Sequence, residues 1–220
     1  MELFERIRQA QERWNVLRHP FYERWEEGAL SREELQTYAG QYRHAVAAVA
    51  SAARHAATLG DYGHAAEEAT HVTLWDAWAA SLGAGRAEPS AETVECVERW
   101  TPRDPLAATA VLYAVESAQP AIAETKLQGL LEHYGYRADS PALSYFSIHA
   151  ERDHEHAARA ETILRERPPD ADDDALAEAA AEAVRANWVL LDGVERLNGR
   201  YAAIAPSSVS SRCLRSSPPP

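Results

Sequence analysis

The chain has 220 residues, of which 46% are hydrophobic, and this is enough for one ordinary domain with its own core. Its formal net charge of −12 and the lack of a basic patch argue against binding to nucleic acids or anionic membranes. No apolar run approaches the roughly 18 residues of a membrane span, and the opening residues MELFERIRQAQERW are too charged for a secretory signal. The two cysteines form no CxxC motif. We therefore expect a cytoplasmic protein.

The chain favours helices throughout, because alanine is abundant and proline falls mostly between segments. Ser31 and Glu34 form a capping box that should open one long helix. Asp104 is a helix cap followed by proline at the first helical position, and Pro120 should kink the helix that starts there. In chain order we expect eight helical stretches, at residues 2–17, 19–28, 31–58, 63–82, 90–100, 105–134, 141–167 and 172–198.

The pattern predicts an all-α fold, a single-domain helical bundle that occupies residues 1–201. Residues 202–220 are poor in large apolar side chains, and we expect them to form a disordered tail.

The stretch SIHAERDHEHAARA, residues 147–160, carries polar side chains on the face of a helix that should meet the core. His149, Asp153 and His156 are spaced by four and then three residues, which stacks them along one stripe. Helical bundles build metal sites from inward-facing carboxylates and histidines, so this stripe is a candidate set of three ligands.

Two other helices offer candidate ligands. Glu68 and His71 are three residues apart on one face, with Glu67 as an alternative to Glu68, and Glu116 lies in the middle of an apolar helix. Each residue alone is more often a surface group or a satisfied core residue, but three helices with matching ligands indicate a dinuclear centre. Imidazole and carboxylate suit iron or manganese. His64 is seven residues before His71 and could line the cavity, but we favour a surface position.

Four segments resemble the heme-oxygenase-like diiron oxidases, a family of about seven to eight helices near the TenA thiaminases and the pyrroloquinoline-quinone synthases. These segments are HPFYERWEEGALSREELQTYAGQYRHAV, HVTLW, YAVESAQPAIAETKLQGLLEHYG and YFSIHAERDHEHA. Within the family, the chain is most similar to the para-aminobenzoate synthases related to the chlamydial protein associating with death domains. The resemblance covers roughly residues 15–165 and implies an O2-activating enzyme with two ions, Fe/Fe or alternatively Mn/Fe.

The family pattern maps onto the ligand set of this chain, with one departure. It implies metal ligation by a set of six side chains: Glu68 or Glu67, His71, Glu116, His149, Asp153 and His156. In the para-aminobenzoate branch six residues separate the first Glu from the His, and here His64 stands at that position. The shorter Glu-x-x-His form resembles the branch that decarboxylates fatty acids to terminal alkenes.

The resemblance also implies roles for residues that do not bind metal. In the para-aminobenzoate branch a tyrosine of the protein supplies the aromatic ring and a lysine supplies the nitrogen, and Tyr22 and Lys126 fall at the matching places. The alternatives are a wall residue for Tyr22 and a helix-surface cation for Lys126. Val115 departs from the tyrosine expected before the glutamate, which favours an external amine, amino acid or fatty acid. Tyr38 and Tyr42 could line the cavity, carry a radical or pack in the core.

Three rival functions stay open at this point. A cofactor-independent oxidase similar to the pyrroloquinoline-quinone synthases would need an anion pocket, but few arginines lie on the predicted inner faces. A thiaminase-like hydrolase would need a nucleophilic cysteine, and Cys96 lies outside the helices with polar stripes. A non-catalytic regulator is disfavoured by the acidic composition. The expected partners are a small-molecule substrate, O2 and an external reductant, and a homodimer is a possible assembly.

Overall fold

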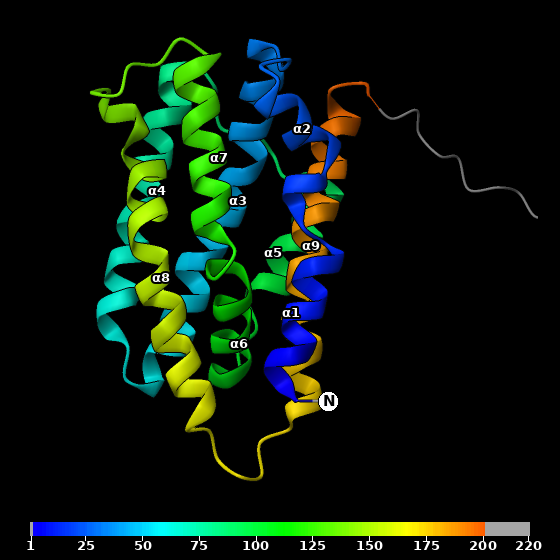
Figure 1. Cartoon of the computed structure of the whole chain (residues 1–220), viewed down its shortest axis with the longest axis vertical. Helices are drawn as coiled ribbons and strands as arrows, with labels where there is room; N and C mark the ends of the chain where they lie inside the picture. Colours follow the sequence, from blue (N-terminus) through cyan, green and yellow to red (C-terminus); the bar gives the residue numbers. More distant parts are fainter. Residues whose placement is uncertain (1, 201–220) are drawn as a thin grey trace, which may run out of the picture.

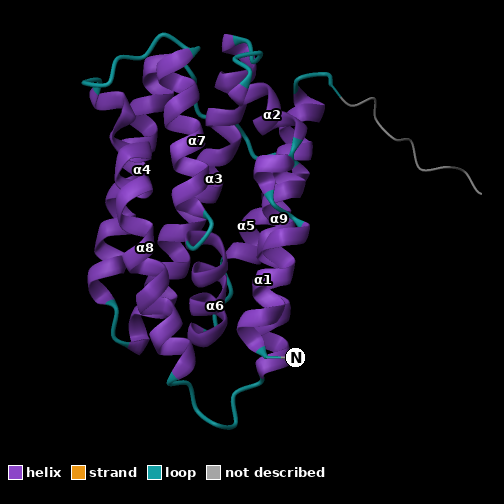
Figure 2. Cartoon of the chain, in the orientation of Figure 1, coloured by secondary structure: helices purple, strands orange, loops and turns teal. Residues whose placement is uncertain are grey.

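The computed structural model describes residues 2–200, so the predicted tail at 202–220 lies outside the described residues. Within the described range the chain is all-helical, without strands, as the sequence predicts (Figure 2). The α-helices are α1 (Leu3–Arg13), α2 (Pro20–Glu26), α3 (Arg32–Ala56), α4 (Tyr62–Leu82), α5 (Ala91–Trp100), α6 (Pro105–Glu116), α7 (Gln119–Glu132), α8 (Ser144–Arg165) and α9 (Asp173–Leu197). Short 3-10 turns cover Val16–Arg18, Ala57–Leu59 and Pro141–Leu143.

The helix boundaries follow the predicted signals. The Ser31 hydroxyl accepts from the Glu34 amide at 3.2 Å, and the Glu34 carboxylate accepts from the Ser31 amide at 2.8 Å, which completes the capping box at the start of α3. Asp104 caps α6 by accepting from the Ala107 amide. These caps satisfy amides that the first helical turn leaves without partners.

The expected kink at Pro120 is a full break between two helices, visible as a short loop between α6 and α7 (Figure 2). The axes of α6 and α7 differ by 41°. The break falls at Ser117 and Ala118, and Pro120 lies in the first turn of α7. Proline has no amide hydrogen and its ring clashes with the carbonyl four residues earlier, so α6 cannot continue into α7 as one helix. The described chain therefore has nine α-helices where the sequence predicts eight stretches.

The long helices run along the long axis of the bundle (Figure 1). Helices α3 and α4 pack together, α8 packs against α6 and α7, and α9 packs against α1, α5 and α6. Of the described helices, none alone is long and apolar enough to cross a membrane; the bent pair α6 and α7 reaches that length and composition only when joined.

The main core cluster is rich in aromatic side chains. Helix α7 comes very close to α2 at Gly129, where an added Cβ would lie 2.6 Å from the Trp25 ring. The Trp25 indole donates to the Lys126 carbonyl at 3.2 Å. This contact fixes α7 against α2 and brings Lys126 toward a group of buried rings, which are those of Phe21, Tyr22, Trp25, Tyr38, Tyr42, Trp75 and Trp78.

Candidate metal centre

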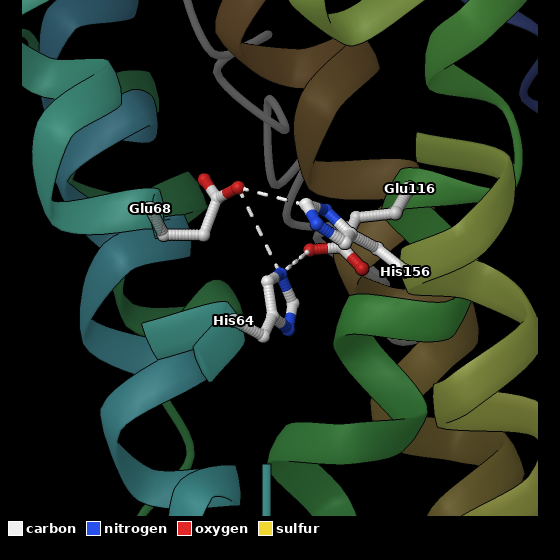
Figure 3. A group of neighbouring side chains, drawn as sticks. All are labelled: His64, Glu68, Glu116 and His156. Atoms are coloured by element: carbon white, nitrogen blue, oxygen red, sulfur yellow. Dashed lines mark ion pairs between the residues drawn. The ribbon is translucent and has the colours of Figure 1, made fainter. Parts of the chain in front are cut away.

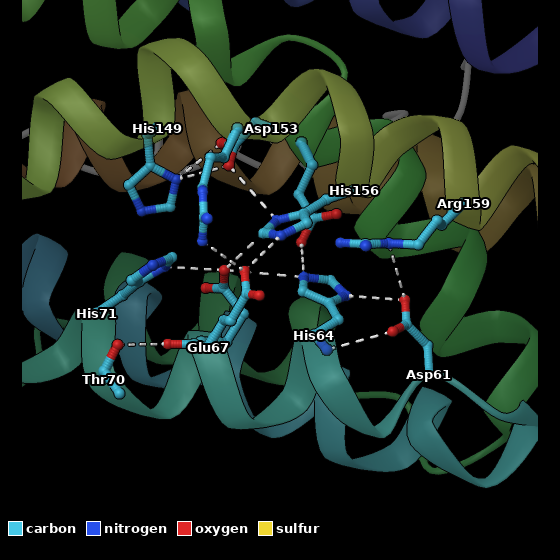
Figure 4. A network of polar contacts seen from close by, with 12 residues as sticks. Asp61, His64, Glu67, Thr70, His71, His149, Asp153, His156 and Arg159 are labelled. Atoms are coloured by element: carbon cyan, nitrogen blue, oxygen red, sulfur yellow. Dashed lines mark hydrogen bonds and ion pairs between the residues drawn. The ribbon is translucent and has the colours of Figure 1, made fainter.

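Helix α4 presents a buried polar stripe to α8 (Figure 4). His64, Glu68 and His71 are separated by four and three residues, so they stand on one face of the helix. All three side chains are at most 4% exposed. Polar groups are rarely buried so completely unless a partner or a ligand satisfies them, so this face requires an explanation.

The first cluster joins α4, α6 and α8 (Figure 3). One nitrogen or oxygen atom from each of His64, Glu68, Glu116 and His156 lies within 4.8 Å of the others. His64 Nε2 is 2.9 Å from Glu116 Oε1 and 3.7 Å from Glu68 Oε1. His156 Nδ1 is 3.8 Å from the same Glu68 oxygen. Two imidazoles and two carboxylates thus converge at one point.

The second cluster joins α4 and α8 and consists of Glu68, His71 and His149. His71 Nδ1 is 2.9 Å from Glu68 Oε1, and the rings of His71 and His149 are 4.5 Å apart. Glu68 belongs to both clusters. Its carboxylate therefore stands between two sets of imidazoles.

The converging atoms are close but poorly aligned for hydrogen bonds with one another. Within residues 2–200, buried ligand atoms from all six residues of the two clusters find no hydrogen-bond partner: His64 Nε2, Glu68 Oε1, His71 Nδ1, Glu116 Oε1 and Oε2, His149 Nε2 and His156 Nδ1. Leaving such atoms unsatisfied costs about 1–3 kcal/mol each. Imidazole nitrogens and carboxylate oxygens are ligands of transition metals, so divalent cations fit both clusters.

Two carboxylates contact the ring nitrogens of cluster histidines that point away from the clusters. Both oxygens of Asp153 accept from His149 Nδ1, at 2.9 and 2.8 Å, which leaves His149 Nε2 facing the second cluster. Glu67 contacts His156 Nε2 at 3.1 Å, which leaves His156 Nδ1 facing the first cluster. A carboxylate on one nitrogen fixes the tautomer and orientation of a ligand histidine. Direct ligation by Asp153 stays a prediction.

The charges within the site oppose one another. Burial raises the pKa of Glu68, but its contact with His71 and the neighbouring imidazoles outweigh burial and leave that pKa below its ordinary value. Burial and the negative charge of Glu68 raise the pKa of Glu116 well above its ordinary value. The two carboxylates thus have pKa values shifted in opposite directions. A bound cation would lower the pKa of Glu116, because carboxylates bind metals in the deprotonated form.

The structure corrects the expectation for His64. It is 4% exposed and lies in the first cluster, so a surface position is wrong. The reason is helical geometry: His64 precedes Glu68 by one turn and His71 by two, so it shares their face. That spacing was the signal that could have found it.

Lys126 also corrects an expectation, because it is fully buried and a surface cation is wrong. Its Nζ finds no hydrogen-bond partner in the described part of the chain. Burial lowers the pKa of Lys126 to about 7, although Asp153 acts against this. Four aromatic rings surround its Nζ, with centroids at 4.6 Å for Tyr42, 5.7 Å for Tyr38, 5.8 Å for Tyr22 and 5.9 Å for Trp75. We call this arrangement the lysine cage.

One tyrosine of the lysine cage, Tyr42, also lies beside ligand candidates of the metal clusters. The hydroxyls of Tyr22 and Tyr38 are 3.1 Å apart, and burial raises the pKa of both. Tyr42 lines a cavity of about 10 Å³ together with Glu68, Glu116 and His149. That volume holds about one water-sized molecule. A small diatomic molecule could therefore sit between the lysine cage and both clusters.

Cys96 does not look like a nucleophile. It is completely buried on α5, outside both clusters, and burial raises the pKa of its thiol. Thiolates are the reactive form of cysteine, so burial suppresses reactivity.

A family model and several known proteins match most of this chain. A family model described as iron-containing redox enzyme matches residues 38–188. A 4-aminobenzoate synthase from Chlamydia muridarum is 32% identical over 199 residues, covering 81% of this chain and 84% of that protein. A 4-aminobenzoate synthase from Nitrosomonas europaea is 33% identical, covering 82% of this chain and 85% of that protein.

Solved structures share the fold. A domain with a heme oxygenase-like fold from Shewanella denitrificans superposes with a TM-score of 0.74 at 17% identity, over 90% of this chain and 94% of that chain. A TenA homolog from Pseudomonas syringae gives a TM-score of 0.71 at 16% identity, over 88% and 91% of the two chains. These identities establish the fold alone, and the expected heme-oxygenase-like bundle is confirmed.

Proposed function

The chain belongs to the iron-containing redox enzymes with a heme-oxygenase-like fold, and from this premise we propose that it is an O2-activating diiron oxidase that forms 4-aminobenzoate, as its relatives are named. The observation that carries the proposal is the pair of buried clusters whose ligand atoms find no hydrogen-bond partners among residues 2–200. Because these atoms accept or donate no hydrogen bond within the described residues, they are free to bind cations.

The two clusters would hold the two ions. His64, Glu116 and His156 would hold one ion, His71 and His149 the other, and Glu68 both. Ferrous ions bound there would supply electrons and open coordination positions for the reduction of O2. Iron in both positions is our proposal, with manganese in one as the alternative, because imidazole and carboxylate suit either metal.

The residues around the clusters would orient the ligand histidines, exclude water from the amine of Lys126 and set the protonation of that amine. Asp153 and Glu67 keep His149 and His156 in the tautomers that leave one nitrogen free. The aromatic walls of the lysine cage exclude water from the amine of Lys126. Because its pKa is about 7, a large share of that amine is neutral at physiological pH and carries a free lone pair.

The lysine cage favours the protein itself as the source of the product. The resemblance makes Tyr22 the ring source and Lys126 the nitrogen source, and the structure has Lys126 Nζ 5.8 Å from the Tyr22 ring centroid. Both are sealed from solvent. Val115 and the short spacing of Glu68 and His71 favour the second candidate, an oxidase of an external amine, amino acid or fatty acid. A cytoplasmic location, an external reductant and a homodimer stay predictions.

Intact-protein mass spectrometry separates these possibilities. The protein is loaded anaerobically with ferrous iron, its iron content is measured, and one turnover is started with reductant and O2. We expect up to two irons per chain, loss of side-chain mass at Tyr22, and 4-aminobenzoate that carries ¹⁵N when the lysines are labelled. Tyr22→Phe is the matched control for the ring source, and it should keep its iron and release no product.

Two results would contradict the proposal in different ways. Iron content at background would remove the metal centre altogether. An unchanged protein mass, with O2 consumed only when a small molecule is added, would reject self-consumption and leave the oxidase of an external substrate.

A further inference from the structure

A larger cavity of about 290 Å³ is lined by residues of α6, of α7 and of the break between them. Helices α1, α6, α7 and α9 surround it, on the side of the bundle where α1 and α9 run (Figure 1). Trp14, Val16, Ile122 and Val184 give it largely apolar walls. Its volume is at the lower end for sites that bind small molecules, which begin at about 300 Å³.

Val115 stands between this cavity and the metal centre. Its side chain lines both the 290 Å³ cavity and the small cavity beside the clusters. Val115 is partly exposed, whereas the next residue, Glu116, is 3% exposed and lies in the first cluster. Val115 is therefore a wall residue shared by the outer cavity and the small cavity beside the clusters.

Asn187 on α9 supplies a polar group to the cavity. Its Oδ1 is buried and finds no hydrogen-bond partner among the residues described. Burial raises the pKa of the Tyr42 hydroxyl well above its ordinary value, and the nearby Asn187 side chain lowers it in part. Asn187 thus adjoins a residue that lines the small cavity. A buried carbonyl without a donor is satisfied by a ligand that brings an N–H or O–H group.

Charged side chains lie at the outer part of the cavity. Arg8 and Glu12 line it, both are exposed, and the Arg8 guanidinium pairs with Glu12 and with Glu5. The cavity therefore offers a hydrogen-bond acceptor beside Tyr42, apolar walls along its length, and mixed charges toward solvent.

We propose that this cavity is the port for a small aromatic amine, with Asn187 Oδ1 accepting from the amino group and Val115 as the partition toward the metal centre. The inference rests on the proposed function, whose product has this chemistry. In 4-aminobenzoate a flat apolar ring separates an amino group from a carboxylate. With the amino group at Asn187 and the ring against the apolar walls, the carboxylate points toward solvent, where Arg8 lies.

Binding is measurable on the purified full-length chain without iron. Protein labelled with 5-fluorotryptophan gives a ¹⁹F resonance for Trp14, assigned with Trp14→Phe, and this resonance reports on the cavity wall. We expect 4-aminobenzoate to shift it in a saturable way by about 5 mM, and benzoate, which lacks the amino group, to bind about five to ten times more weakly, the worth of one hydrogen bond.

Two substitutions test the assignment. Asn187→Leu should reduce binding of 4-aminobenzoate to the level of benzoate. Ala121→Phe adds a ring to the lining and should abolish the shift, while Gln128→Phe, an exposed position on the same helix outside the lining, should not. Three results would overturn the port. They are equal binding of both ligands to the unmodified chain, a Trp14 shift that survives Ala121→Phe, and a Trp14 shift that appears when the protein is diluted without added ligand.

The outcome is independent of the proposed function, because it needs neither iron nor turnover. Iron at background with an intact Trp14 response would reject the oxidase and keep the port. Product release by the iron-loaded protein without any Trp14 response would reject the port and keep the oxidase. With both in place, Val115→Phe, which enlarges the partition, should slow release of the product made at the centre.

Discussion

Replacing Lys126 with methionine should stabilise the metal-free protein, most of all at neutral and acidic pH. The ordinary lysine pKa is 10.5 and burial lowers it to about 7, so between these values the unfolded chain holds a proton that the folded chain does not. Stability of the natural protein therefore rises with pH across this window. At 1.36 kcal/mol per pH unit, the penalty for Lys126 is about 4 kcal/mol at pH 7 and about 2 kcal/mol at pH 9.

Methionine has a similar length, does not titrate and packs well against aromatic rings. The difference in unfolding free energy between Lys126→Met and the natural protein should therefore fall by about 2 kcal/mol from pH 7 to pH 9. The aromatic faces favour the ammonium form, so these magnitudes are upper bounds. Chemical denaturation of both proteins at several pH values, with chelator present, measures the difference while all other groups cancel. A pH-independent difference, or a less stable variant, would refute a largely neutral lysine in an apolar cage.

The remaining predictions concern the metal centre and its support. Glu68→Ala should abolish O2 reactivity and lower the iron content at both positions, while Glu67→Ala should only weaken reactivity; the reverse order, in stopped-flow traces of O2 consumption, would make Glu67 the ligand. His64→Ala should remove about one iron per chain, measured by metal analysis, and two irons retained with natural affinity would return His64 to a purely structural role. Cys96→Ala should change the rate of O2 consumption by less than about twofold, since a buried thiol is unreactive. Gly129→Ala should lower the unfolding free energy by about 1–3 kcal/mol, because the added methyl overlaps the indole of α2; an unchanged denaturation midpoint would show that α2 can move away.

Local signals in the sequence account for most of the fold. The capping box at Ser31 and the cap at Asp104 mark helix starts within a residue or two, because each depends on contacts between near neighbours. The break at Pro120 is predictable for the same reason, but its angle is not. Without that angle, the burial of Lys126 cannot be predicted. Lys126 lies ten residues beyond Glu116, on the other side of the break, so rotation at the bend decides whether its side chain is buried.

The candidate site is predictable where ligands share one helix and less so where helices meet. The stripe of His149, Asp153 and His156 follows from spacing alone. That Asp153 holds His149 from behind, while Glu68 faces both clusters, depends on how α4 and α8 approach each other. His64 was also within reach of the spacing argument, because it precedes Glu68 by one helical turn.

The position of Glu68 has a thermodynamic consequence for metal loading. The same oxygen, Oε1, approaches His64, His71 and His156, so both clusters draw on one donor atom. In the proposed dinuclear centre, the first cation to bind would change the charge and orientation of a ligand that the second cation also uses. Occupancy of one position would therefore alter affinity at the other, and by linkage the effect would be equal in both directions. Titration with metal should give two unequal stoichiometric steps rather than a single isotherm of identical sites.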